Sequence, residues 1–191
     1  MTSAERTRWN DTHRGKSDAG DPEPFLVEML PLLPGGGLVL DIAAGRGRNA
    51  VALARAGQRV VAADFSQVAI RILADFARSE RLTIWPVLAD FDRFAFRDRS
   101  FEAIVDVNFL DRTLFPEFAR ALKPGGILIV ETFLIDQAEI GHPSDPRFLL
   151  RHYELRELLA GLELLRYREG LVAYADGSRA WRAGAVARRT P

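Results

Sequence analysis

Short apolar runs alternate along this chain with stretches whose apolar residues recur at helical spacing. Five runs predict strands, at residues 38–42, 60–63, 82–88, 101–107 and 127–132. The unbroken run at 60–63 is typical of a parallel strand that is buried on both faces. Helices are predicted between and before these strands, over residues 22–33, 48–56, 67–76 and 116–122. Such alternation of strands and helices predicts an α/β fold.

The last third of the chain predicts one more helix and two more strands. Leucines at helical spacing indicate an amphipathic helix over residues 149–159, after a polar loop at 139–147. Strands at 162–168 and 179–187 bring the number of strands to seven. At the other end, polar residues 1–21 predict a flexible N-terminal arm or lid, and residues 22–191 have the length of a single domain.

The amino-acid composition limits the kinds of binding partner that we expect for this chain. Lys+Arg and Asp+Glu number 26 each, so no net charge attracts a polyanion, and we expect no binding to nucleic acid. The chain has no cysteine and three scattered histidines, which excludes disulfides and predicts no metal site. It has neither a signal-like start nor an apolar run of membrane-spanning length. A cytoplasmic protein without membrane contact is therefore expected, and its oligomeric state is not predicted.

A glycine-containing turn follows the first predicted strand and carries the candidate chemistry. It reads Asp41-Ile42-Ala43-Ala44-Gly45-Arg46-Gly47-Arg48-Asn49-Ala50, and Asp64 ends the next strand. Small residues before a helix N-terminus admit a ligand close to the backbone, and a carboxylate such as Asp64 can accept both ribose hydroxyls. Further polar residues end the next two strands at the same predicted edge, Asp90 and Asn108. The pattern predicts a site for an adenosine-containing cofactor there.

The turn also satisfies the G-x-G-x-x-A fingerprint of nicotinamide and flavin enzymes, so an NAD- or FAD-dependent oxidoreductase is one alternative. Against it, the Asp41 carboxylate at the strand end repels a pyrophosphate and suits a cationic ligand.

The acid and small residues of the turn resemble motif I of the class I S-adenosylmethionine-dependent methyltransferases, with Ala43 where that family usually has glycine. A second similarity is the turn Leu122-Lys123-Pro124-Gly125-Gly126 before a strand. The segments Asn108-Phe109-Leu110 and Glu131-Thr132-Phe133 look like the tellurite-resistance-type small-molecule methyltransferases. The resemblance implies one methyltransferase domain over residues 22–191. Its expected fold is a Rossmann-like, doubly wound, seven-stranded, mostly parallel sheet with an antiparallel C-terminal hairpin strand.

By this resemblance the cofactor is S-adenosyl-L-methionine, and one group of residues would hold its methionine end. Asp41 would face the ammonium group. Three small residues would let the backbone approach the methionine portion, namely Ala43, Gly45 and Gly47. Val107 and Asn108 would close the site near the sulfonium.

A second group would hold the adenosine end of the cofactor. Asp64 would accept the ribose hydroxyls and Phe65 would pack on the adenine. Asp90 would accept from the adenine amino group, and the backbone of Phe91 would meet the ring edge.

The resemblance leaves the acceptor open. Methyl transfer from a sulfonium is an in-line displacement that needs positioning and exclusion of water and no dedicated nucleophile. A small-molecule acceptor is expected, possibly a thiol or chalcogen anion, which would need a cationic mouth. Candidates near the predicted strand ends are Arg112, His142, Arg147, Arg151 and His152. The resemblance also implies that Trp9 and Arg14 fold over the cofactor. A catalytically inactive, cofactor-binding sensor or assembly module is the other alternative.

Overall fold

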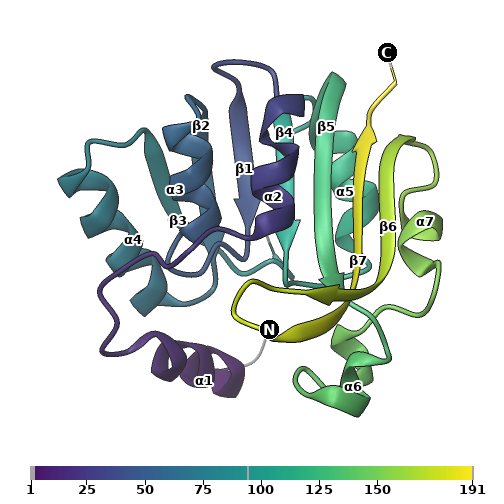
Figure 1. Cartoon of the computed structure of the whole chain (residues 1–191). Helices are drawn as coiled ribbons and strands as arrows, with labels where there is room; N and C mark the ends of the chain where they lie inside the picture. Colours follow the sequence, from purple (N-terminus) through teal and green to yellow (C-terminus); the bar gives the residue numbers. More distant parts are fainter. Residues whose placement is uncertain (1–2, 94, 191) are drawn as a thin grey trace.

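One seven-stranded sheet organises the chain in the computed structural model, which describes residues 3–93 and 95–190 (Figure 1). The strands follow the order β3-β2-β1-β4-β5-β7-β6. Their bounds are β1 Leu38–Ile42, β2 Arg59–Asp64, β3 Ile84–Leu88, β4 Phe101–Val107, β5 Leu122–Phe133, β6 Glu163–Ala173 and β7 Arg179–Arg188. The first five strands pair in parallel, and β7 runs antiparallel to both β5 and β6. This confirms the predicted doubly wound sheet with its antiparallel C-terminal hairpin strand.

Two apolar layers cover the sheet because its strands alternate side chains between its faces. In β1, Leu40 and Ile42 enter the core beneath α5 (Leu114–Ala121) and α7 (Glu154–Leu158). Val39 enters the opposite core. That core is built by α2 (Pro24–Met29), α3 (Arg48–Arg55) and α4 (Gln67–Ser79).

The remaining helical segments with a bearing on the site lie at the carboxyl ends of the parallel strands. They are α1 (Ser3–His13), α6 (Gln137–Ile140) and the 3-10 turn η2 (Pro146–Phe148). Figure 1 shows α1 and α6 below this edge, with the tip of the β6–β7 hairpin between them. Residues 3–13 thus form a helix where the sequence predicted a flexible arm or lid. No helix within the described residues is long and apolar enough to cross a membrane.

Several predicted elements have different bounds in the structure. The helix expected over 149–159 begins at Glu154, because Leu150 joins the backbone of the β5 end: its N–H donates to the Phe133 carbonyl at 2.8 Å. The strand expected from residue 82 begins at Ile84, since the Leu82 N–H donates to the Ala77 carbonyl at the end of α4.

The helix expected over 22–33 is divided into α2 and the 3-10 turn η1 (Leu30–Leu32). Pro31 lies in η1 and has no N–H to continue an α-helix. Near the middle of the chain, α5 begins two residues earlier than predicted, at Leu114, and β5 already includes the turn at 122–126.

Candidate functional site

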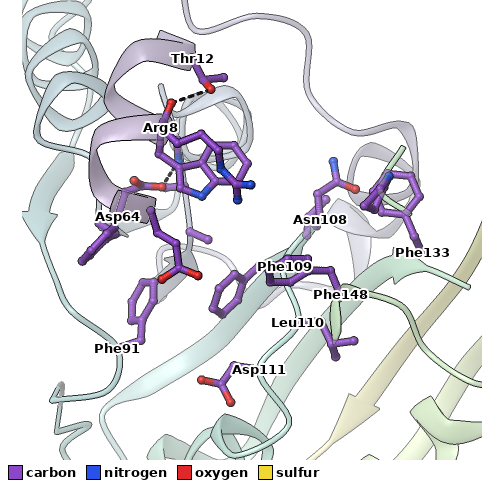
Figure 2. Close-up of a pocket in the computed structure, with 18 of the residues that line it drawn as sticks. Arg8, Thr12, Asp64, Phe91, Asn108, Phe109, Leu110, Asp111, Phe133 and Phe148 are labelled. Carbon is purple, nitrogen blue, oxygen red and sulfur yellow. Dashed lines mark hydrogen bonds between the residues drawn. The ribbon is translucent and has the colours of Figure 1, made fainter. Parts of the chain in front are cut away.

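The carboxyl ends of the parallel strands open into a cavity of about 1090 Å³ (Figure 2). Its walls come from α1, the turn between β1 and α3, the ends of β2, β4 and β5, and residues 142–148. Seven of the ten residues predicted to bind the cofactor line it: Ala43, Gly45, Asp64, Phe65, Phe91, Val107 and Asn108. The three acceptor-side candidates Arg112, His142 and Arg147 also line it. The topology therefore brings together residues far apart in the sequence at the predicted edge.

The turn after β1 is held by left-handed backbone. Ala43, Gly45 and Gly47 have φ values of 51°, 56° and 90°. Gly45 faces the cavity, whereas Gly47 is not among the described residues that line it. A methyl group built on Gly47 would lie 2.2 Å from Cδ1 of Leu73, a buried residue of α4. Gly47 thus permits close packing between α4 and the turn, which differs from the ligand contact expected from the sequence.

Asp41 also lies outside the described lining, buried beside Val39 in the core beneath α3. Burial raises the pKa of the Asp41 carboxyl to about 8, although a hydrogen bond from the Ala50 backbone lowers it. No group among the described residues donates a hydrogen bond to Asp41 Oδ2. A second buried carboxyl, Asp106 of β4, has its pKa raised well above the usual range, again mainly by burial.

Asp64 ends β2 at the cavity wall, where two backbone N–H groups hold its carboxylate. Gly45 donates to Oδ2 at 2.7 Å and Ser66 donates to Oδ1 at 2.6 Å. Burial raises the pKa of Asp64, and these hydrogen bonds oppose the rise. His13 of α1 lies close by, and burial lowers the pKa of its imidazole while the Asp64 charge raises it.

The predicted adenine-side residues are only partly arranged as expected. Phe65 and Phe91 line the cavity, but the guanidinium of Arg6 already lies over the Phe65 ring, 4.4 Å from its centroid. Within the described part of the chain, Asp92 lines the cavity and Asp90 does not. Asp90 lies in the turn after β3, where its Oδ1 accepts from the Asp92 N–H at 3.3 Å. Asp92 is therefore the carboxylate of this turn that faces the cavity.

Apolar side chains line the cavity away from Asp64, together with charged residues such as Asp111, Arg112 and Asp145. Four side chains supply carbon surface there: Phe133 from β5, Phe109 and Leu110 from the segment after β4, and Phe148 from η2. Phe109 packs against Phe91 with ring centroids 5.5 Å apart. Figure 2 shows Asp64 and Phe91 on one side of the hollow and Phe133 and Phe148 on the other. The sequence prediction had not assigned these phenylalanines a site role.

Two of the five cationic candidates, Arg112 and Arg147, are already engaged by carboxylates. Arg112 binds Glu154 through Nε at 2.7 Å and Nη2 at 3.1 Å. Arg147 binds Asp145 through Nη2 at 2.6 Å. Each arginine has its pKa raised by the partner carboxylate. These pairs reduce the positive charge available to an anionic acceptor.

Two further candidates, Arg151 and His152, are not among the described residues that line the cavity. Arg151 contacts Glu154 and Glu157, and His152 lies between Asp136 and Glu169, with its ring nitrogens 2.8 and 2.6 Å from their oxygens.

α1 lies across the side of the cavity that carries Asp64 and Phe65. Asn10 Oδ1 accepts from Ser66 Oγ at 2.8 Å and from the Val68 N–H at 3.3 Å, so α1 caps the start of α4. Trp9 stacks on His13, and both line the cavity. Arg14, expected to join Trp9 over the cofactor, lies outside the described lining and pairs with Asp11 at 3.1 Å. Sequence alone gave no signal for this helix, because it has no apolar face to mark it.

A family model and individual relatives both relate this chain to methyltransferases. The sequence model of the family described as "Methyltransferase domain" matches residues 39–126. The demethylmenaquinone methyltransferase of Corynebacterium urealyticum is 35% identical over 160 residues, which cover 80% of this chain. The chain spans 64% of that relative's length.

Solved structures share the fold. TehB from Haemophilus influenzae superposes with a TM-score of 0.75 at 21% identity, covering 86% of this chain and 61% of that one. A structure described under the conversion of a disulfide bond into a thioacetal group during echinomycin biosynthesis gives a TM-score of 0.77 at 22% identity. That match covers 97% of this chain and 92% of the other.

Proposed function

We propose that this chain, which belongs to the class I S-adenosylmethionine-dependent methyltransferases, transfers the methyl group of S-adenosylmethionine to a small, planar, carbon-rich acceptor. The observation that carries the proposal is a single cavity with two different ends. One end has carboxylates and a left-handed glycine turn, and the other is lined by phenylalanine side chains.

The polar end suits the cofactor. Asp64 presents a fixed carboxylate at the end of β2, the site that a ribose needs, and Gly45 leaves the backbone open beside it. Asp41 lies behind the cavity wall, and its buried Oδ2 has no donor among the described residues, so the ammonium end of the cofactor would reach it through a bridging water and not directly. Val107 and Asn108, at the end of β4, would lie between the two ends. These residues fit S-adenosylmethionine, with Asp92 a better placed partner than Asp90 for the adenine.

The apolar end suits a neutral ring better than an anion. Phe109, Phe133 and Phe148 offer aromatic surface, while the nearest arginines are paired with carboxylates. The demethylmenaquinone methyltransferases among the relatives have, by their name, a quinone as acceptor, which agrees with this choice. A thiol or chalcogen anion remains the second candidate, because Arg112, His142 and Arg147 do line the cavity.

The residues of the site contribute by binding the two reactants, orienting them and excluding water. When bound, S-adenosylmethionine supplies a methyl group that is already activated for displacement. Asp64 and the turn at Gly45 fix one reactant, and the phenylalanines orient the other and exclude water. Positioning of this kind can lower the barrier by about 7–11 kcal/mol.

Calorimetric titration with S-adenosylmethionine, its demethylated product and NADH tests the cofactor. We expect the sulfonium pair to bind, NADH not to bind, and Asp64→Ala to weaken the pair. A folded protein that binds NADH and neither member of the pair would be an oxidoreductase candidate instead.

An acceptor panel then tests the second reactant. It contains hydroquinones and phenols, thiols, and chalcogen oxyanions under reducing conditions, with release of the demethylated product as the readout. We expect turnover with the rings, reduced by Phe133→Ala. Turnover only with thiols or chalcogen anions would move the acceptor to the second candidate. Tight cofactor binding with no turnover across a broad panel would favour the sensor or assembly module.

A further inference from the structure

Residues 142–148, which we call the acceptor-side wall, form one side of the cavity on the connection between α6 and α7 (Figure 1). The wall residues that line the cavity are His142, Pro143, Ser144, Asp145, Arg147 and Phe148. The regular structure of this wall is the three-residue turn η2. Contacts with other elements must therefore fix its position.

Two side chains from outside the acceptor-side wall hold its ends. At its start, Gln137 Nε2 donates to the His142 carbonyl at 3.0 Å. At its end, Arg112 donates to the carbonyls of residues 147 and 149 at 3.1 and 2.9 Å while it binds Glu154. A guanidinium keeps its charge in proteins at any ordinary pH, so the Arg112 contact does not depend on pH.

His152 supplies a further contact just after the wall, and it joins three elements. Its Nδ1 lies 2.6 Å from Glu169 Oε1 of β6, and its Nε2 lies 2.8 Å from Oδ2 of Asp136, the residue before α6. The next residue reinforces the contact, because the Tyr153 N–H donates to Glu169 Oε2 at 3.0 Å. His152 thus ties the chain that leaves the wall to α6 and to β6.

The geometry around His152 requires the charged imidazolium. A neutral imidazole has one N–H and one lone pair, whereas an imidazolium has an N–H on both nitrogens. A nitrogen lone pair at either of these distances would be repelled by the carboxylate oxygen, so both contacts exist together only when both nitrogens are protonated. The buried Oδ2 of Asp136 has no other donor among the described residues, so the charge of the imidazolium compensates it.

The surroundings of His152 favour its charged form. The charged and titratable groups around it are Asp136, Glu169, Tyr167, Tyr153 and, over the Tyr167 ring, Arg156. The hydrogen bond with Glu169 raises the pKa of the imidazole, burial opposes the rise, and the Asp136 charge adds to it.

The raised pKa gives the contact a defined pH dependence. Histidine is the side chain that ordinarily changes charge between pH 5 and 8. Because the pKa is higher in the folded protein, the stabilisation is complete below the ordinary histidine pKa of about 6.5. It is lost as the pH rises through the folded-state pKa.

We propose that His152 is a positioning residue for methyl transfer, whose imidazolium holds the end of the acceptor-side wall, and with it Phe148, against the acceptor. This rests on the proposed function, which makes this part of the cavity the acceptor side. Of the two ionic contacts that follow the wall, the Arg112–Glu154 pair is permanent and the His152 contact is released as the pH rises. The wall therefore becomes less ordered at alkaline pH.

Hydrogen exchange followed by mass spectrometry, with the intrinsic pH dependence of exchange divided out, tests the contact without any acceptor. We expect the protection of amides in residues 149–153 to fall about 2- to 10-fold between pH 6 and pH 9, as for half-exposed ion pairs. Amides within α4 monitor any change in global stability. His152→Gln can still form hydrogen bonds but carries no charge, so its protection should be low at pH 6 and independent of pH.

His142→Gln is the matched control, because it removes another histidine from the same wall and should keep the wild-type profile. NMR titration of the imidazoles gives a second readout that does not depend on exchange. The pKa of His152 should lie above the ordinary histidine value in the wild-type protein and move down towards it in Asp136→Asn and in Glu169→Gln.

The effect on the reaction is measured as a ratio of KM values for one acceptor of the panel. The KM of His152→Gln should exceed that of the wild type at pH 6, and the two values should converge as the pH rises. Taking the ratio at each pH cancels the ionisation of the acceptor itself. The affinity for S-adenosylhomocysteine should be the same in both proteins, because His152 is not among the described residues that line the cavity.

Two results would overturn the proposal. A flat wild-type exchange profile, or a fall of equal size in His152→Gln, would show that the imidazolium does not hold the segment. A pH-dependent exchange profile with equal KM values at pH 6 would show that the contact does not position the acceptor. Absence of turnover with every acceptor would count against the proposed function alone, because the exchange and NMR measurements need no acceptor.

Discussion

Replacing Gly47 by alanine separates a packing role from a ligand-binding role for this glycine. The new methyl group would lie 2.2 Å from Leu73 Cδ1 and 3.0 Å from its Cδ2 and Cγ. Leu73 is fully buried and cannot move aside freely. The residue also has a φ of 90°, which alanine adopts only with strain.

The two costs can be estimated separately. The left-handed φ costs an alanine about 1–2 kcal/mol, and overpacking against a buried leucine costs about 1–3 kcal/mol. We therefore expect Gly47→Ala to lower the free energy of unfolding by about 2–5 kcal/mol. Gly57→Ala is the matched control, because Gly57 has a φ of 86° and nothing within 4 Å of the added methyl group. Gly57→Ala should therefore lower the free energy of unfolding by about 1–2 kcal/mol, the cost of the left-handed φ alone.

Urea unfolding followed by circular dichroism and fluorescence measures both variants, and coincident transitions establish two-state behaviour. The difference between them should be about 1–3 kcal/mol, or about 2–4 °C in Tm for each kcal/mol. Adding Leu73→Ala to Gly47→Ala should cost less than the sum of the single changes. Equal costs for the two glycine variants would refute the packing argument. Weakened cofactor binding without loss of stability would restore the ligand contact expected from the sequence.

Two further predictions concern buried carboxylates. Asp41 has a folded-state pKa raised to about 8, so its protonated form contributes stability at low pH that is lost as the pH rises from about 4 towards 8. The wild-type free energy of unfolding should therefore fall more steeply than that of Asp41→Asn across urea titrations from pH 5 to pH 8, and parallel profiles would contradict the buried-acid assignment. Arg112→Met leaves the buried Glu154 without its bidentate partner and frees the carbonyls of residues 147 and 149. It should cost about 1–3 kcal/mol and speed proteolysis within residues 139–153, whereas Arg112→Met with Glu154→Gln should recover part of the loss.

The parts of the fold that follow from local pattern were predictable. The runs at β1, β2 and β4 are mainly apolar, and the strand–helix alternation places their carboxyl ends at one edge. That topology is sufficient to bring Gly45, Asp64 and Asn108 to one cavity.

Contacts between distant segments were not predictable. The packing of Gly47 depends on Leu73 in another helix, and the buried carboxylate of Glu23 contacts Arg182 and Tyr174 near the other end of the chain. A local pattern contains no information about such partners.

The predicted start of the helix at residue 149 was wrong for a related reason. Leu150 fits an amphipathic helix by its spacing, yet its backbone is hydrogen-bonded to Phe133. A tertiary hydrogen bond thus overrides the helical pattern. The N-terminal segment shows the opposite case, a helix that its own residues do not predict. The polar helix α1 is held by tertiary contacts, in which Asn10 accepts hydrogen bonds from Ser66 and Val68.

The position of α1 sets the order of events in ligand exchange. Arg6 covers one face of the Phe65 ring, so a planar ligand group that takes this face must first displace the guanidinium. The side-chain contacts that hold α1 there are individually weak, about 1 kcal/mol each, so the helix can lift without unfolding of the sheet. If lifting precedes entry, the observed association rate reaches a plateau at high ligand concentration, and that plateau is the opening rate of the helix. Turnover then cannot exceed the opening rate of α1.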